Sequence, residues 1–76
     1  MSGLAHRARR RTGLSQRAFS ALLDVHPSTV ARWETGERQV SAPACALLLL
    51  IEAEPRLCAA LLAGRADRAS NALRAR

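Results

Sequence analysis

The stretch that decides the fold is LSQRAFSALLDVHPSTVARWETGER, residues 14–38. Its first half has the signature of a short helix. Ser15 is a favourable N-cap, because its hydroxyl can accept a hydrogen bond from an orphan backbone N–H. Phe19, Leu22 and Leu23 then follow at i, i+3 and i+4, which places them on one apolar face. The spacing therefore predicts a helix that begins at residue 16.

The second half predicts another short helix, separated from the first by a tight turn. Residues 24–26 (Asp-Val-His) form the turn, and Pro27 stands in the first turn of the next helix, where proline is tolerated. That helix runs to about Glu34 with Val30 and Trp33 inward, and Gly36 ends it. Two short helices joined in this way, within a basic all-helical chain, predict a helix-turn-helix.

Outward from this unit the pattern remains helical, with no strand-like alternation. We expect further helices at about residues 4–11, 42–53 and 56–63, the first ended by Gly13 and the last by Gly64. The prediction is a compact all-α domain of five helices over residues 1–64. Residues 65–76 are basic and rich in alanine, and they are expected to be a frayed helix or a disordered tail.

Composition restricts the function. The 76 residues carry a net charge of +6, and all twelve basic residues are arginine, which binds phosphates and base edges. So small a domain has no room for a large substrate cavity, and no catalytic set is apparent, so we expect no enzyme activity. Cys45 and Cys58 lack metal-ligand spacing and are expected to be small buried apolar residues, without a metal or cofactor. Residues 1–13 lack the apolar core of a secretory signal, and no apolar stretch is long enough to span a membrane.

Residues 14–38 resemble the XRE/Cro/lambda-repressor-type helix-turn-helix family, whose pattern is Ser-Gln, Phe-Ala, Leu-Gly-Val, Ser/Thr-Val and Trp-Glu-x-Gly-x-Arg. The continuation LLLLIEAEP, residues 47–55, is similar to DNA-binding antitoxins of the HigA type. The resemblance implies a lambda-repressor-like fold and a sequence-specific transcriptional regulator of bacterial or phage origin, acting in the cytoplasm at the nucleoid. An antitoxin that neutralises a toxin and represses its own operon is the alternative.

The resemblance also implies roles for individual residues. Arg32 on the recognition helix is expected to read a guanine, because a guanidinium can bridge O6 and N7. Arg9 and Glu34 are expected to form a structural ion pair. The whole set of DNA contacts implied, to bases and to phosphates, is Gln16, Arg17, His26, Pro27, Ser28, Thr29, Arg32 and Arg38.

This chain departs from the family pattern at two positions. Asp24 stands where the family has a turn glycine, and aspartate tolerates the left-handed conformation better than most residues. Ser20 replaces an alanine at a close-packed position. Neither change removes the motif.

Some residues permit two interpretations. The five arginines between Arg7 and Arg17 fit either a solvated face or a set of phosphate contacts. Trp33 fits the core better than a stacking platform, because its spacing from Val30 turns it inward. His26 fits a turn residue at the start of the helix better than a ligand or a catalytic base.

The expected helix over residues 42–53 is apolar on every face, which a thin domain cannot easily cover. We expect a homodimer whose interface includes Leu48, Leu49, Leu57 and Leu61. A dimer would place two recognition helices on half-sites about 10 bp apart, which favours a palindromic operator in double-stranded DNA. The competing interpretation is a surface for another protein, such as a toxin.

Overall fold

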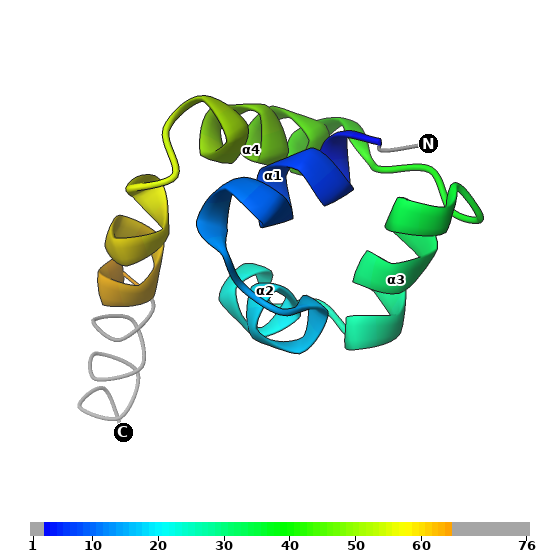
Figure 1. Cartoon of the computed structure of the whole chain (residues 1–76), viewed down its shortest axis with the longest axis horizontal. Helices are drawn as coiled ribbons and strands as arrows, with labels where there is room; N and C mark the ends of the chain where they lie inside the picture. Colours follow the sequence, from blue (N-terminus) through cyan, green and yellow to red (C-terminus); the bar gives the residue numbers. More distant parts are fainter. Residues whose placement is uncertain (1–2, 65–76) are drawn as a thin grey trace, which may run out of the picture.

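A computed structural model of the chain describes residues 3–64, and it places four complete helices around one core (Figure 1). The helices are α1 (Leu4–Thr12), α2 (Gln16–Leu23), α3 (Pro27–Thr35) and α4 (Ala42–Ala53). A further helical segment covers residues 57–64. The all-α fold predicted from the sequence is confirmed, and the predicted tail at residues 65–76 lies outside the described residues.

The helix ends follow the local chemistry of the sequence. The Ser15 hydroxyl accepts a hydrogen bond from the Ala18 N–H at 3.1 Å, so Ser15 caps α2 as predicted. Gly13 and Gly36 end α1 and α3 in the left-handed conformation, with φ of 75° and 81°. Asp24 ends α2 in the same conformation, at φ 60°, and is the one non-glycine residue of the described chain with positive φ. The turn between α2 and α3 therefore forms without the family's glycine.

The core lies where α1 crosses α4 and where α2 meets α3. It consists of the fully or almost fully buried side chains of Ala5, Ala8, Phe19, Leu22, Val30, Leu48 and Ile51. Trp33 and Cys58 are half-buried and pack against it. Ser20 is buried as well, and its hydroxyl donates to the Arg17 carbonyl at 2.7 Å, so the serine causes no unsatisfied polar group.

One expectation about the C-terminal half is wrong. Leu48 is 0% exposed within a single chain, because α1 packs against this side of α4, so Leu48 cannot form a dimer interface. Gly64, expected to end the last helix, is itself helical, and the residues that follow it lie outside the described part of the chain.

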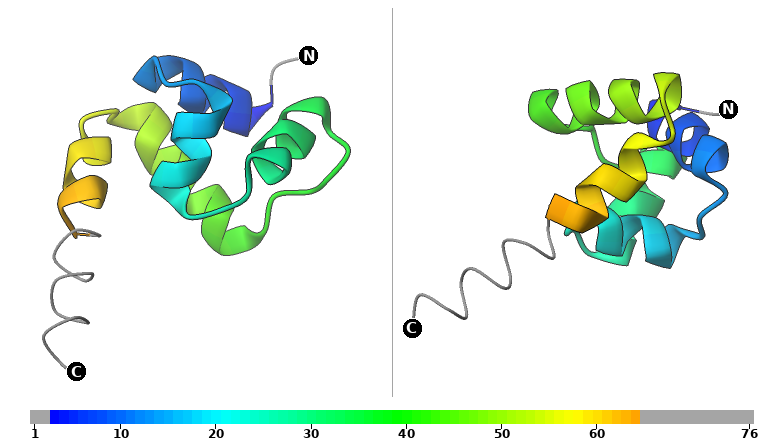
Figure 2. Two further views of the ribbon diagram at one scale, coloured as in Figure 1. Left: turned by 90° about the horizontal axis from the view of Figure 1, so that it is seen from below. Right: turned by 90° about the vertical axis from the view of Figure 1, so that its left-hand side faces the viewer.

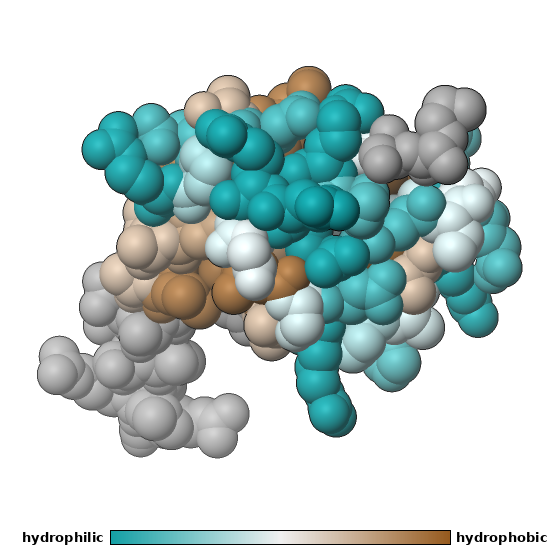
Figure 3. Space-filling view, in the orientation of Figure 1, coloured by the Kyte–Doolittle hydropathy of each residue, from teal (hydrophilic) through white to brown (hydrophobic). Residues whose placement is uncertain are grey.

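Apolar side chains remain uncovered on the far side of α4. Leu49 and Leu50 are 52% and 56% exposed, and Leu62 is 57% exposed. Beside them lies a groove of about 250 Å³, which we call the leucine groove, lined by Leu47, Leu50, Leu57, Ala60 and Leu61. Residues 57–64 form one wall, at the end of the molecule opposite α3 (Figure 2). The space-filling view shows apolar side chains gathered in this region (Figure 3).

Candidate nucleic-acid interface

The inner side of α3 is held by a polar network that joins three helices. The Arg9 guanidinium donates from Nε to Glu34 Oε2 at 2.6 Å and from Nη2 to Glu34 Oε1 at 3.0 Å. Arg9 also donates to the Leu14 carbonyl at 3.1 Å, and Gln16 Nε2 donates to Glu34 Oε1 at 3.2 Å. The network therefore connects the end of α1, the start of α2 and the end of α3, and it brings together the two residues of the expected ion pair.

The charges of this network are mutually stabilised. The hydrogen bonds from Arg9 lower the pKa of Glu34, against the opposing effect of its burial, and the same pair raises the pKa of Arg9. The Glu34 and Arg9 side chains are only 9% and 19% exposed, so water screens the interaction weakly. Glu34 is thus an ionised anchor, which supports the structural role expected from the sequence.

The N-terminus of α3 is capped by a histidine. His26 Nδ1 accepts a hydrogen bond from the Ser28 N–H at 3.1 Å and lies 2.8 Å from Ser28 Oγ. Since Nδ1 is the acceptor, a neutral His26 ring carries its proton on Nε2. The ring therefore stabilises the first turn of α3, and Pro27 stands at the first helical position as predicted.

The outer side of α3 exposes Arg32, which is 54% exposed and forms an ion pair through Nε with Glu37 Oε2 at 3.2 Å. Ser28 and Thr29, which were expected to contact DNA, are half-buried. Thr29 lines a groove of about 370 Å³ together with Val25, His26, Trp33, Arg38, Gln39, Ser41 and Ala44. Arg17 and Arg38 are exposed. The structure thus brings Thr29, His26 and Arg38 to one groove.

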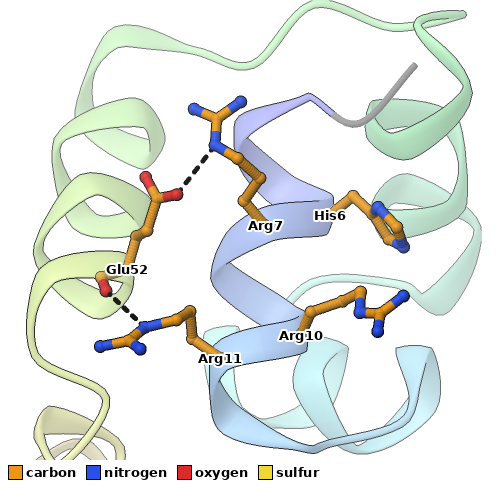
Figure 4. A pocket seen from close by; sticks show the side chains of 5 residues that line it. All are labelled: His6, Arg7, Arg10, Arg11 and Glu52. Carbon is orange, nitrogen blue, oxygen red and sulfur yellow. Dashed lines mark hydrogen bonds and ion pairs between the residues drawn. The ribbon is translucent and has the colours of Figure 1, made fainter.

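The arginines of α1 do not form one uniform patch. Arg9 is directed into the network beneath α3, whereas Arg7 donates to Glu52 Oε2 at 2.8 Å and Arg11 donates to the Glu52 carbonyl at 3.1 Å. Arg7 and Arg11 thereby hold α1 to the end of α4 (Figure 4). His6 and Arg10 lie on the other side of the same shallow pocket, of about 390 Å³.

The comparison with known families agrees with this geometry. A family model described as Helix-turn-helix matches residues 6–50, more than half of the chain, from α1 into α4. The chain belongs to the XRE-type helix-turn-helix family. It is a DNA-binding transcription regulator. No curated protein and no solved structure matches the chain.

Other kinds of site find little support in the described part of the chain. Within residues 3–64, His, Cys, Asp and Glu side chains form no group of three or more that could hold a metal ion. None of the helices in that range is long and apolar enough to cross a membrane. Cys45 and Cys58 are free thiols, and burial raises the pKa of Cys58.

The sequence analysis did not identify two acidic residues that pair with arginines, Glu52 and Glu37. Glu52, on α4, pairs with an arginine 45 residues earlier, and no local pattern indicates such a contact. Glu37 stands at the first variable position after Gly36 in the motif, five residues after Arg32. The available signal was an acid just beyond the C-cap glycine of a helix with an arginine in its last turn, because opposite charges across a helix C-terminus can pair.

Proposed function

We propose that this regulator is a homodimeric repressor that binds a palindromic operator through the outer face of α3. In this proposal the operator overlaps the promoter of the protein's own gene, and the bound dimer excludes polymerase. The observation that supports this is the asymmetry of α3. Its inner side is fixed by Arg9, Gln16 and Glu34, while Arg32 stands exposed on the outer side. A rigid support with an exposed reader is the arrangement that major-groove recognition requires.

In this proposal the contacts divide into two kinds. Arg32 reads a guanine through O6 and N7, while Ser28, Thr29 and Pro27 lie against neighbouring base edges. Arg17, Arg38 and the Nε2–H of His26 hold phosphates, which set register and affinity rather than sequence. Gln16 orients the start of α2, because its amide donates to Glu34.

We further propose that the leucine groove and the exposed Leu49, Leu50 and Leu62 form the dimer interface. Large apolar side chains that are more than half exposed favour association, because burying them releases water from apolar surface. Leu57 and Leu61 keep the role expected from the sequence, and Leu50 takes the place of Leu48.

The function is tested by a gel-shift titration against the DNA upstream of the protein's own gene, with a scrambled competitor, at near-physiological salt. Binding that resists the competitor at a palindrome supports a specific repressor. Binding that salt abolishes equally for both DNAs contradicts it, because phosphate contacts alone carry no sequence information.

The dimer is tested by Leu50→Glu, which should give monomers in sedimentation equilibrium because a carboxylate cannot be buried unpaired in an apolar interface. Ala21→Glu adds the same charge to an exposed site on α2 and should leave the dimer intact. A Leu50→Glu dimer would contradict this interface. Monomeric wild-type protein that binds a co-expressed toxin through Leu50 would favour the antitoxin alternative.

A further inference from the structure

Glu37 contacts the residue expected to read the DNA, although it lies outside the recognition helix. Its carboxylate Oε2 is 3.2 Å from Arg32 Nε, and the two side chains are 68% and 54% exposed. The pair is therefore on the same open surface that the proposed function assigns to DNA. An exposed ion pair of this kind contributes little to folding stability, so its consequence is to be sought in binding.

The backbone explains why the two side chains meet. Gly36 takes the left-handed conformation at φ 81° and turns the chain back toward α3. The Arg38 N–H then donates to the Arg32 carbonyl at 3.1 Å, and the Thr35 hydroxyl donates to the same carbonyl at 3.2 Å. Glu37 lies between these fixed points, so its position beside Arg32 is built into the end of α3.

The geometry of the pair leaves Arg32 able to read a base. The ion pair involves Nε, whereas a guanidinium has further donors on Nη1 and Nη2 that can bridge guanine O6 and N7. A carboxylate beside the guanidinium restricts the side chain to fewer rotamers. It also offsets the positive charge that would otherwise attract Arg32 to any phosphate.

We propose that Glu37 is a positioning residue that determines specificity: it holds Arg32 in a reading position and weakens the binding of unrelated DNA. This inference rests on the proposed function of Arg32. Glu37 makes the protein bind more selectively rather than more tightly, because repulsion from phosphates acts on every DNA while the oriented guanidinium favours guanine alone.

The experiment compares Glu37→Gln with wild type on two duplexes: the best sequence recovered from a random pool by the wild-type protein, and a scrambled version of it. Dissociation constants are measured over a salt series. Glu54→Gln is the matched control, because it also removes an exposed, arginine-paired carboxylate, but at the end of α4 away from α3. Thermal unfolding verifies that both variants remain folded.

We expect Glu37→Gln to bind scrambled DNA up to about fivefold more tightly, the factor that an exposed ion pair can supply, with a smaller gain on the selected duplex. Its selected sequences should also lose preference at one base pair. In an Arg32→Ala background the substitution should no longer change the ratio of the two affinities.

Three results would overturn the inference. Equal gains on both duplexes, matching those of Glu54→Gln, would reduce Glu37 to a contribution to net charge. No change in either affinity in Glu37→Gln, with a wild type that prefers its selected duplex, overturns the role of Glu37 and leaves the proposed function standing. A wild type that selects no sequence at all overturns both.

Discussion

The two ion pairs of α3 have the same chemistry and opposite surroundings. Arg9–Glu34 lies on the inner side, is mostly shielded from water and joins α1, α2 and α3 through several hydrogen bonds. Arg32–Glu37 lies on the outer side, is more than half exposed and connects residues only five apart. Shielding strengthens the first pair and makes its loss costly, whereas solvent screens the second. The comparison indicates that one pair supports the helix and the other is available to DNA.

The largest effect should come from breaking the inner pair. Glu34→Ala leaves the Arg9 guanidinium partly buried without its counter-charge, which should lower the free energy of unfolding by about 3 kcal/mol in urea denaturation. Replacing both residues, as Arg9→Met with Glu34→Leu, should restore part of that loss, because no unpaired charge then remains. A Glu34→Ala protein as stable as wild type would contradict the supporting role of this pair.

The same pair predicts an acid dependence of stability. Because the folded-state pKa of Glu34 is below its ordinary value of 4.5, its contribution is complete above that pH. The contribution is lost as the pH falls through the lowered folded-state pKa. Urea denaturation of Glu34→Ala between pH 7 and pH 3 should therefore show a weaker dependence on pH than wild type.

A substitution on the outer side of α3 should change DNA binding and leave folding stability almost unchanged. Arg32→Ala should weaken binding to the selected duplex by about 1–3 kcal/mol and relax preference at one base pair. Its free energy of unfolding should stay within about 0.5 kcal/mol of the wild-type value, since the side chain is exposed. Selection from a random pool provides the measurement, and unchanged specificity would remove Arg32 as the base reader.

Arg17→Ala and Arg32→Ala remove the same charge, so a comparison of the two variants distinguishes a phosphate contact from a base reader. Arg17→Ala should weaken selected and scrambled duplexes alike and should reduce the slope of log K against log salt by about one. Arg32→Ala is the matched comparison, because it should affect the selected duplex more than the scrambled one. A salt slope that stays at the wild-type value would show that Arg17 holds no phosphate.

The sequence predicted those parts of the fold that depend on neighbouring residues. Ser15 and Pro27 marked helix starts and Gly13 and Gly36 marked helix ends, because caps and left-handed turns are formed by residues a few positions apart. Long-range contacts were harder to infer. The Arg9–Glu34 pair came from family resemblance, since 25 residues separate its members.

The helix α4 shows why burial could not be read from the sequence in the C-terminal half. Residues 44–51 are apolar on every face, so no periodicity distinguishes the side that α1 covers from the side left open. Leu48 and Leu50 are chemically identical, and only the packing of α1 makes one buried and the other exposed. The Arg32–Glu37 pair was missed for a different reason, since it depends on the direction in which the Gly36 turn leaves α3.

The smallest effect should come from a substitution in the turn between α2 and α3. This turn supports α3 and is not part of its outer face. Asp24 adopts φ 60°, where glycine has no Cβ penalty. It also places a negative charge at the C-terminus of α2, where the helix dipole disfavours it. Asp24→Gly should therefore raise the free energy of unfolding by about 0.5–1 kcal/mol. Glycine removes the strain of the left-handed conformation, and part of that gain is offset because glycine gives the unfolded chain more conformational freedom. DNA affinity and specificity should not change. A gain in stability accompanied by altered specificity would mean that the turn influences the outer face of α3, and that the two sides of the helix are less independent than their ion pairs indicate.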